Sequence, residues 1–178
     1  RRVVVLMDSL GRAYDPATKA AGGSNADDIS EALRDLPVVL VKENTNSMWL
    51  REEQVMRQNP DLIVSHLSCL VDARVGAGEN AIQQHLFEVA ENRLVVFLAY
   101  IAARNSRTQF IIYSRSAFEA AGAGDRWVAV QEGRLPVLRS RLHAFHVPKG
   151  DTIATFRDAA TAKLLRGRVT QVLGLTER

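Results

Sequence analysis

The chain opens on an apolar run that few folds can accommodate. Residues 3–6 read Val-Val-Val-Leu, without a polar residue between them. A strand with water on one face alternates apolar and polar side chains, so an unbroken run indicates a strand covered on both faces, as in a parallel sheet between helices. Asp8 and Ser9 follow at once. The sequence therefore places a carboxylate and a hydroxyl at the carboxyl end of a central strand, where open α/β sheets bind ligands.

Later stretches repeat this pattern of an apolar run that gives way to polar residues. Three of them, 38–41, 62–64 and 110–113, predict further buried strands, and 142–147 predicts a fifth. Their carboxyl ends carry polar side chains, namely Asn44, Asn46, Ser65, His66, Ser68 and Ser114. Because parallel strands end at the same edge of a sheet, we expect these groups to gather near Asp8 and Ser9.

Helical spacing of apolar residues predicts helices after the first, second, third and fifth of these strands. Helices are expected from Ser24 to Pro37, over 51–58, over about 80–103 and over about 152–173. Residues predicted on the inner faces of the last two are Ile82, Leu86, Val89, Phe97 and Ile101, and then Phe156, Ala160 and Leu164. The segment 117–141 gives a mixed signal, with a short helix and strand character over 127–130.

Alternation of strands and helices predicts one α/β domain over residues 1–178. Right-handed crossovers place helices on both faces of a parallel sheet, so we expect a three-layer α/β/α sandwich with five mainly parallel strands, a flavodoxin-like layout. Substrate specificity would come from the segments 11–25, 43–50 and 115–141.

Composition excludes several classes of function. The 178 residues include 23 basic and 20 acidic side chains, and a net charge of +3 is too small to indicate a nucleic-acid partner. No apolar run reaches the roughly 20 residues that span a bilayer, so we expect a soluble protein without a membrane span. Cys69 is the single cysteine, which excludes an intramolecular disulfide and a cysteine-based metal motif and slightly favours the cytoplasm.

Asp8-Ser9-Leu10 behind a buried strand resembles the opening motif of the SGNH, or GDSL, hydrolases, in which Gly-Asp-Ser-Leu carries the nucleophilic serine. Met7 stands in the place of the glycine. The similarity continues through Pro60-Asp61-Leu62-Ile63-Val64, the long helix, the strand 110–113 and a histidine, His146, ahead of the last helix. Order and spacing match over almost the whole chain.

The resemblance implies an ester or acyl hydrolase of an SGNH-like fold, with Ser9 as nucleophile beside Asp8 and His146 as general base. It implies a small-molecule ester or acyl substrate, no cofactor and no metal. Two family motifs are incomplete. The segment 67–70 reads Leu-Ser-Cys-Leu where the family has Gly-x-Asn-Asp, and His143 stands where the family has the aspartate of Asp-x-x-His.

The incomplete motifs leave three alternatives. A serine hydroxyl needs a base within reach, that base works best when a third group orients it, and losing one oxyanion donor costs about 10²–10³ in rate. The protein is therefore a slow hydrolase, a hydrolase rebuilt around binding residues such as Asn44, Asn46, His66 and Ser68, or a catalytically silent domain that binds or signals.

Two further functions are open to the same residues. Receiver domains share the five-stranded layout, and Asp8, Ser114 and Lys149 would imitate their acidic, hydroxyl and lysine positions, with His66 in the place of the phosphoacceptor.

A metal site would need the histidine side chains to point toward one another. His143 and His146 are three residues apart on a predicted strand, where side chains alternate, so we expect no metal there.

Overall fold

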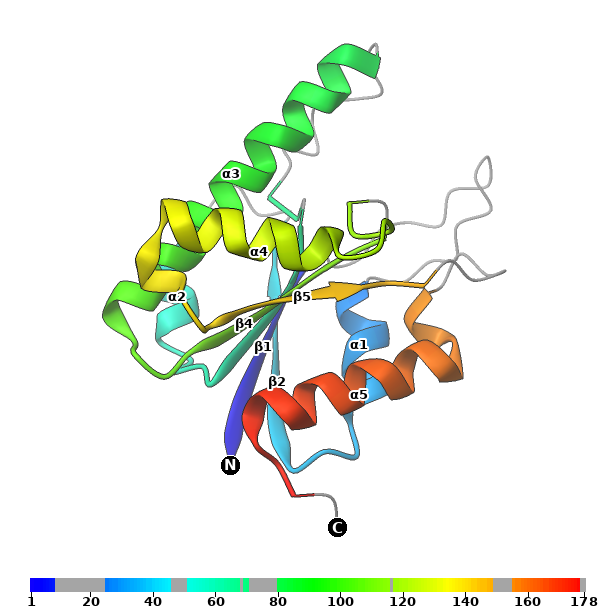
Figure 1. The fold of residues 1–178 in the computed structure, drawn as a ribbon. Coiled ribbons are helices and arrows are strands. Elements are labelled where there is room, and N and C mark those ends of the chain that lie inside the picture. Colours follow the sequence, from blue (N-terminus) through cyan, green and yellow to red (C-terminus); the bar gives the residue numbers. More distant parts are fainter. Residues whose placement is uncertain are drawn as a thin grey trace.

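The computed structural model of the chain describes residues 1–8, 25–45, 51–67, 69–70, 80–115, 117–148 and 155–176 (Figure 1). Its strands form one five-stranded sheet in the order β2-β1-β3-β4-β5, and all four strand pairs are parallel. The strands are β1 (Arg2–Asp8), β2 (Val38–Asn44), β3 (Leu62–His66), β4 (Gln109–Ser114) and β5 (Leu142–His146). The predicted parallel sheet is confirmed.

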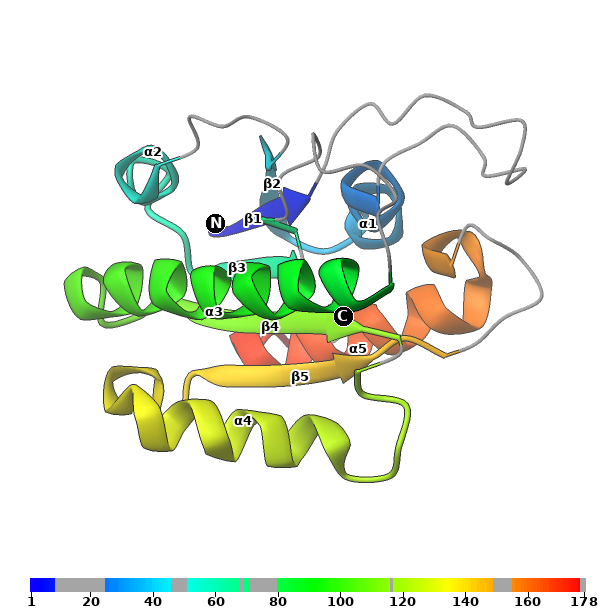
Figure 2. The same cartoon turned by 90° about the horizontal axis from the view of Figure 1, so that it is seen from above.

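Helices cover both faces of this sheet, as Figures 1 and 2 show. One face carries α2 (Glu52–Met56), α3 (Asn80–Arg104) and α4 (Ala123–Arg134), with the 3₁₀ helix η1 (Pro136–Leu138) after α4. The other face carries α1 (Asn25–Leu33), the 3₁₀ helix η2 (Thr155–Arg157) and α5 (Ala159–Leu173). The structure therefore has the expected three-layer α/β/α sandwich. No helix in the described ranges is long and apolar enough to cross a membrane.

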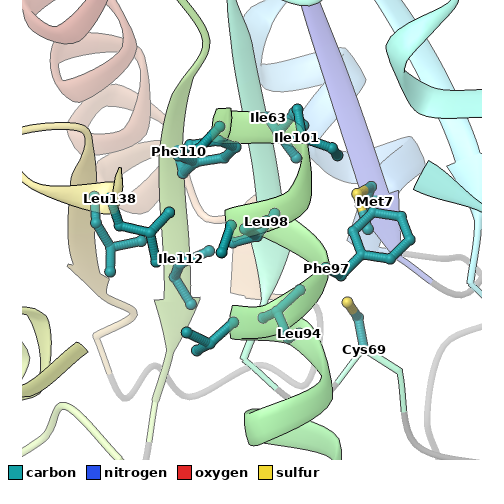
Figure 3. Close-up of a cluster of buried hydrophobic side chains, with 14 of the residues drawn as sticks. Met7, Ile63, Cys69, Leu94, Phe97, Leu98, Ile101, Phe110, Ile112 and Leu138 are labelled. Atoms are coloured by element: carbon teal, nitrogen blue, oxygen red, sulfur yellow. The ribbon is translucent and has the colours of Figure 1, made fainter. Parts of the chain in front are cut away.

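Strand alternation divides the core into two clusters. Met7, Ile63 and Ile112 point toward α3, where they meet Leu94 and Leu98 (Figure 3). The residues between them in the strands point toward α1 and α5; these include Val4, Leu6, Leu62, Val64, Ile111, Tyr113 and Phe145. The unbroken apolar runs of the sequence arise because each strand contributes to both clusters.

The strands extend further toward their carboxyl ends than the apolar runs predict. Asp8, Asn44, His66 and Ser114 are each the last residue of a strand instead of loop residues. The parallel ladder explains this, since Asp8 is in register with Asn44, and Ser114 with His146. A polar side chain does not end a strand whose backbone groups still find partners on the neighbouring strand.

The strand character predicted over 127–130 is wrong, because this segment lies inside α4. Gly122, with a φ of 73°, stands directly before the helix in a conformation that favours glycine. Trp127 packs against Phe118 and Gln131 is buried, while Val130 is 55% exposed. The burial follows helical spacing, with one apolar side chain left on the solvent side.

The inner face predicted for the last helix is wrong at Ala160 and Leu164, whereas Phe156 is buried but lies in η2, before the helix. Asp158 caps α5 by accepting a hydrogen bond from the backbone N–H of Thr161 at 3.0 Å, so the helix begins after Phe156. Ala160 is exposed and Leu164 is 56% exposed. The buried residues of α5 are Thr161, Ala162, Leu165, Val169 and Leu173. In α3, Val89 is likewise 49% exposed, against the prediction.

Arg141 joins the end of α3 to the start of β4. Its guanidinium donates to the backbone oxygens of Thr108 at 2.9 Å, Ala102 at 2.8 Å and Asn105. Two of these acceptors belong to the last turn of α3 or directly follow it, where carbonyls lack partners within the helix and a cation is favoured.

We expect Arg141→Ala to lower the free energy of unfolding by about 2–3 kcal/mol, because hydrogen bonds from a charged group are lost and carbonyl groups lose their donors. Urea unfolding measures the change. Arg139→Ala removes a neighbouring, exposed arginine and should shift stability by less than about 0.5 kcal/mol. Equal effects of the two substitutions would contradict this role.

Candidate functional site

The carboxyl ends of three adjacent strands bring Asp8, His66 and Tyr113 to one row. Met7 is in register with Ser65, so the next residues, Asp8 on β1 and His66 on β3, lie side by side. His66 is in register with Tyr113 on β4. Alternation along the strands places all three side chains on the α1/α5 side of the sheet, in line with the apolar residues of that side.

Tyr113 connects this row through both its hydroxyl and its ring. The hydroxyl donates a hydrogen bond to Oδ2 of Asp8 at 2.5 Å, although β3 runs between the two strands. The ring packs edge-on against His66, with 5.2 Å between the ring centroids, and against Phe156 of η2 at 5.1 Å. Tyr113 is 1% exposed and Asp8 is 6% exposed. We call this set the Asp8–Tyr113–His66 cluster.

Polar groups of β2 extend the row beyond Asp8. Asn44 is in register with Asp8, and the backbone N–H of Thr45 donates to the backbone oxygen of Asp8 at 3.0 Å. Glu43 is also buried, but alternation places it on the opposite side of the sheet, where it accepts a hydrogen bond from Gln54 at 3.0 Å. Asn44 is therefore the polar side chain at the carboxyl end of β2 that shares a side with Asp8, while Lys42, two residues earlier on the same side, pairs with Asp27 of α1.

Cys69 lies in the turn after β3, buried against Met7 and Phe97 (Figure 3). Its backbone N–H donates to the backbone oxygen of His66 at 3.1 Å. Burial, and secondly the negative charge of Asp8, raise the pKa of its thiol well above the usual range. Because the thiolate is the reactive form, this cysteine is a packing residue and not a nucleophile.

Two further histidines, His143 and His146, lie apart from the cluster. His146 is exposed at the end of the edge strand β5, on the α3/α4 side, the opposite side from Asp8. His143 faces the α1/α5 side, and its Nε2 lies 3.0 Å from Oε1 of Gln109. Burial, followed by the charge of Arg168, lowers the pKa of His143. In the part of the chain that the structure describes, no three His, Cys, Asp or Glu side chains are placed to hold a metal ion.

The structure thus brings together three of the residues singled out from the sequence, Asp8, Asn44 and His66, and leaves His146 at the sheet edge. Ser65 and Ser114 are buried in β3 and β4, and Ser9, Asn46, Ser68 and Lys149 lie outside the described residues. Sequence reasoning missed Tyr113. Its signal was a hydroxyl-bearing aromatic at the carboxyl end of an apolar strand, directly before Ser114, in the position where the other strands present polar groups.

No protein-family model and no curated relative matches the sequence. Two solved structures are similar in fold. One is a carbohydrate esterase whose active site is described as having divergent catalytic and non-catalytic binding functions, with a TM-score of 0.54 and 14% identity. The other is a family two carbohydrate esterase from Cellvibrio japonicus, with a TM-score of 0.51 and 15% identity. They cover 99% and 98% of this chain, which spans 69% and 62% of theirs. At this identity the similarity shows the α/β fold alone.

Proposed function

We propose that this domain hydrolyses small acyl esters, with Ser9 as the nucleophile and a histidine as the general base. The observation that supports it best is the cluster at the carboxyl ends of β1, β3 and β4, where a carboxylate, a phenol and an imidazole lie beside the strand that leads to Ser9. Among described residues, His66 and His146 are the histidines at strand ends, and the sequence resemblance favours His146.

The chemistry runs in two halves. The histidine removes the proton from Ser9 Oγ as this oxygen attacks the ester carbonyl; the tetrahedral intermediate then collapses, and the alcohol leaves with that proton. Water, activated by the same histidine, releases the acid and restores the serine. The similarity in fold to two carbohydrate esterases supports an acylated sugar hydroxyl as the substrate of this domain.

A second candidate function is binding without catalysis. Leu67, Cys69 and Leu70 are buried apolar residues in the segment where the family has its oxyanion asparagine. An oxyanion hole would then need backbone N–H groups or Asn44. A domain that lacks one would keep a carbohydrate-binding surface at the same sheet edge while hydrolysing poorly, because oxyanion stabilisation is among the largest contributions to catalysis.

Covalent labelling separates the two candidates. The protein is incubated with a fluorophosphonate and with 4-nitrophenyl acetate, and its peptides are analysed by mass spectrometry. A hydrolase should turn over the ester and carry the phosphonyl adduct on the peptide that contains Ser9, since only an activated serine reacts quickly. A protein without turnover and without an adduct on that peptide would be the binding domain.

A further inference from the structure

We propose that β2 is a dimerisation edge, at which a second copy of this chain adds its own β2 in antiparallel orientation and extends the sheet from five strands to ten. The proposal concerns an interaction surface and does not depend on the hydrolase. Three observations carry it: the position of β2 in the sheet, the apolar side chains that it exposes, and the opposite charges at the two ends of α1.

The strand β2 lies at one edge of the sheet, between α1 and α2 (Figure 2). Within the described ranges, its one neighbouring strand is β1. The backbone N–H of Thr45 donates to the backbone oxygen of Asp8 on β1. Alternation along β2 therefore directs the N–H and C=O groups of Leu40 and Lys42 away from β1. Groups of this kind at a sheet edge are the ones that accept an added strand.

The side chains of β2 give it little protection against such pairing. Edge strands are usually protected by lysine or proline within the strand, by a bulge or by short length. β2 begins after Pro37, and its seven residues pair with β1 without a bulge. Its lysine, Lys42, is bound at 2.7 Å to Asp27 of α1, which offsets its charge. The other edge strand, β5, has five residues and carries His143 and His146, so β2 is the better edge for pairing.

An apolar stretch in β2, Val39 to Val41, selects the register of the pairing. Val39 is 42% exposed, and Leu40 and Val41 are half-buried. An antiparallel pairing centred on Leu40 puts the two Leu40 side chains together and places Val39 of each copy beside Val41 of the other. Centred on Lys42, it would set two lysines side by side, and centred on Val41, it would set Val39 beside Glu43. The register centred on Leu40 is therefore the favourable one.

Charges on α1 are complementary in the same register. Asp27 contacts Lys42, so it lies on the β2 side of the helix. Arg34 directly follows α1, seven residues or close to two turns later, and both side chains are exposed. Asp27 is level with Lys42 and Arg34 stands shortly before β2 begins, so the middle of β2 lies between the two charges. A two-fold axis at Leu40 thus brings Asp27 of each copy toward Arg34 of the other.

The two α1 helices are needed as well as the strands. A specific interface buries at least about 1,000 Å² in total, more than one pair of short strands provides. Because α1 packs over β1 and β2, the α1 helices of the two copies come alongside each other when the strands pair. Arg34 keeps its contacts with Glu31 and Asp35 of its own chain, and its five N–H donors leave capacity for a third carboxylate.

Sedimentation equilibrium on the full chain tests the dimer. At about 50 µM the mass should be about twice the 19.7 kDa of one chain. Val39→Glu should weaken the dimer at least about tenfold, because it buries a carboxylate in the apolar strand pair. Val130→Glu is the matched control, at a valine that is 55% exposed on α4, and it should leave the dimer intact. A monomeric wild type, or equal effects of the two substitutions, would overturn the proposal.

Charge reversal tests the contact between the α1 helices. Arg34→Glu places a second negative charge beside Asp27 of the other copy, and it should weaken the dimer by about threefold to tenfold at low salt. The loss should shrink as salt is added. Arg139→Glu, at an exposed arginine before β5, should have no effect. A dimer that Arg34→Glu leaves unchanged would overturn the arrangement of α1 beside α1.

A cysteine pair tests the register, and it remains decisive if Val39→Glu does not fold. In the proposed pairing the Cα atoms of the two Leu40 residues are about 5.5 Å apart, within the span of a disulfide. Leu40→Cys should form a linked dimer on oxidation with copper phenanthroline. Lys42→Cys should not, because its Cα atoms would be about 14 Å apart. Native Cys69 does not compete, since burial raises the pKa of its thiol and keeps it protonated.

The linked products and a thermal melt of each variant complete the test. Linkage of Leu40→Cys alone supports the proposed pairing. Linkage of Lys42→Cys alone would overturn the register, and linkage of neither folded variant would overturn the pairing of β2 with β2 itself.

Discussion

Ser9→Ala abolishes the hydrolysis of short activated esters if the proposed function is correct, with a fall in kcat of about 10³–10⁶-fold. The reason is chemical: the serine oxygen forms the bond to the acyl carbon, and alanine has no atom that replaces it. One hydroxyl contributes little to folding, so the thermal midpoint should hardly change. Steady-state kinetics and a thermal melt on the same preparation measure both quantities.

Two observations accompany this result. Ser106→Ala is the matched control, since Ser106 is an exposed serine in the turn between α3 and β4, at the amino end of the sheet. It should keep full activity. The wild-type rate should rise with pH through the titration of a histidine, whose unperturbed pKa is about 6.5, because the base acts in its neutral form. Equal activity of wild type and Ser9→Ala would remove Ser9 as the nucleophile.

The fold was predictable because four of the five strands contain an unbroken apolar run, whereas β5 reads Leu-His-Ala-Phe-His and carries a weaker signal. Runs such as 3–6 and 62–64 contain no polar residue, and only a strand covered on both faces needs that pattern. The strand ends were less predictable. Asp8 and His66 look like turn residues in the sequence, but the neighbouring strands extend the ladder through them. Local polarity does not show whether a partner strand continues.

Helix faces were predicted less well than helix positions. Leu164 has the spacing of an inner residue relative to Phe156 and Ala160, yet it is 56% exposed. The cap at Asp158 starts the helix after Phe156, so the phase of the helix cannot be counted from that residue. Successive residues are about 100° apart only within one continuous helix, so counting from Phe156, which lies in η2, selects the wrong face of α5.

The candidate site was predictable only as far as topology determines it. Parallel strands end at one edge, which is why Asp8, Asn44 and His66 could be expected together. Linear order does not give the strand order, and β5 proves to be an edge strand three positions from β1. Tyr113 escaped prediction because its ring belongs to the core pattern of β4, while the contact of its hydroxyl with Asp8 spans 105 residues of sequence.

Leu6→Ala should destabilise the protein by about 2–5 kcal/mol, through the lost transfer energy of the side chain and the cavity left behind. Leu6 is 1% exposed in β1 and packs in the cluster beneath α1 and α5. Its neighbours in register are Lys42 on β2 and Val64 on β3, so strands lie on both sides of it and cannot collapse into the space.

A typical domain has only about 5–15 kcal/mol of stability, so this loss should move the urea midpoint far. Leu164→Ala makes the same chemical change at a leucine that is 56% exposed, and it should cost less than about 0.5 kcal/mol. The pair separates burial from the intrinsic effect of shortening a leucine. Equal shifts in the two variants would mean that Leu6 is not in the core. They would also contradict the placement of β1, the strand that ends at Asp8, as a buried central strand.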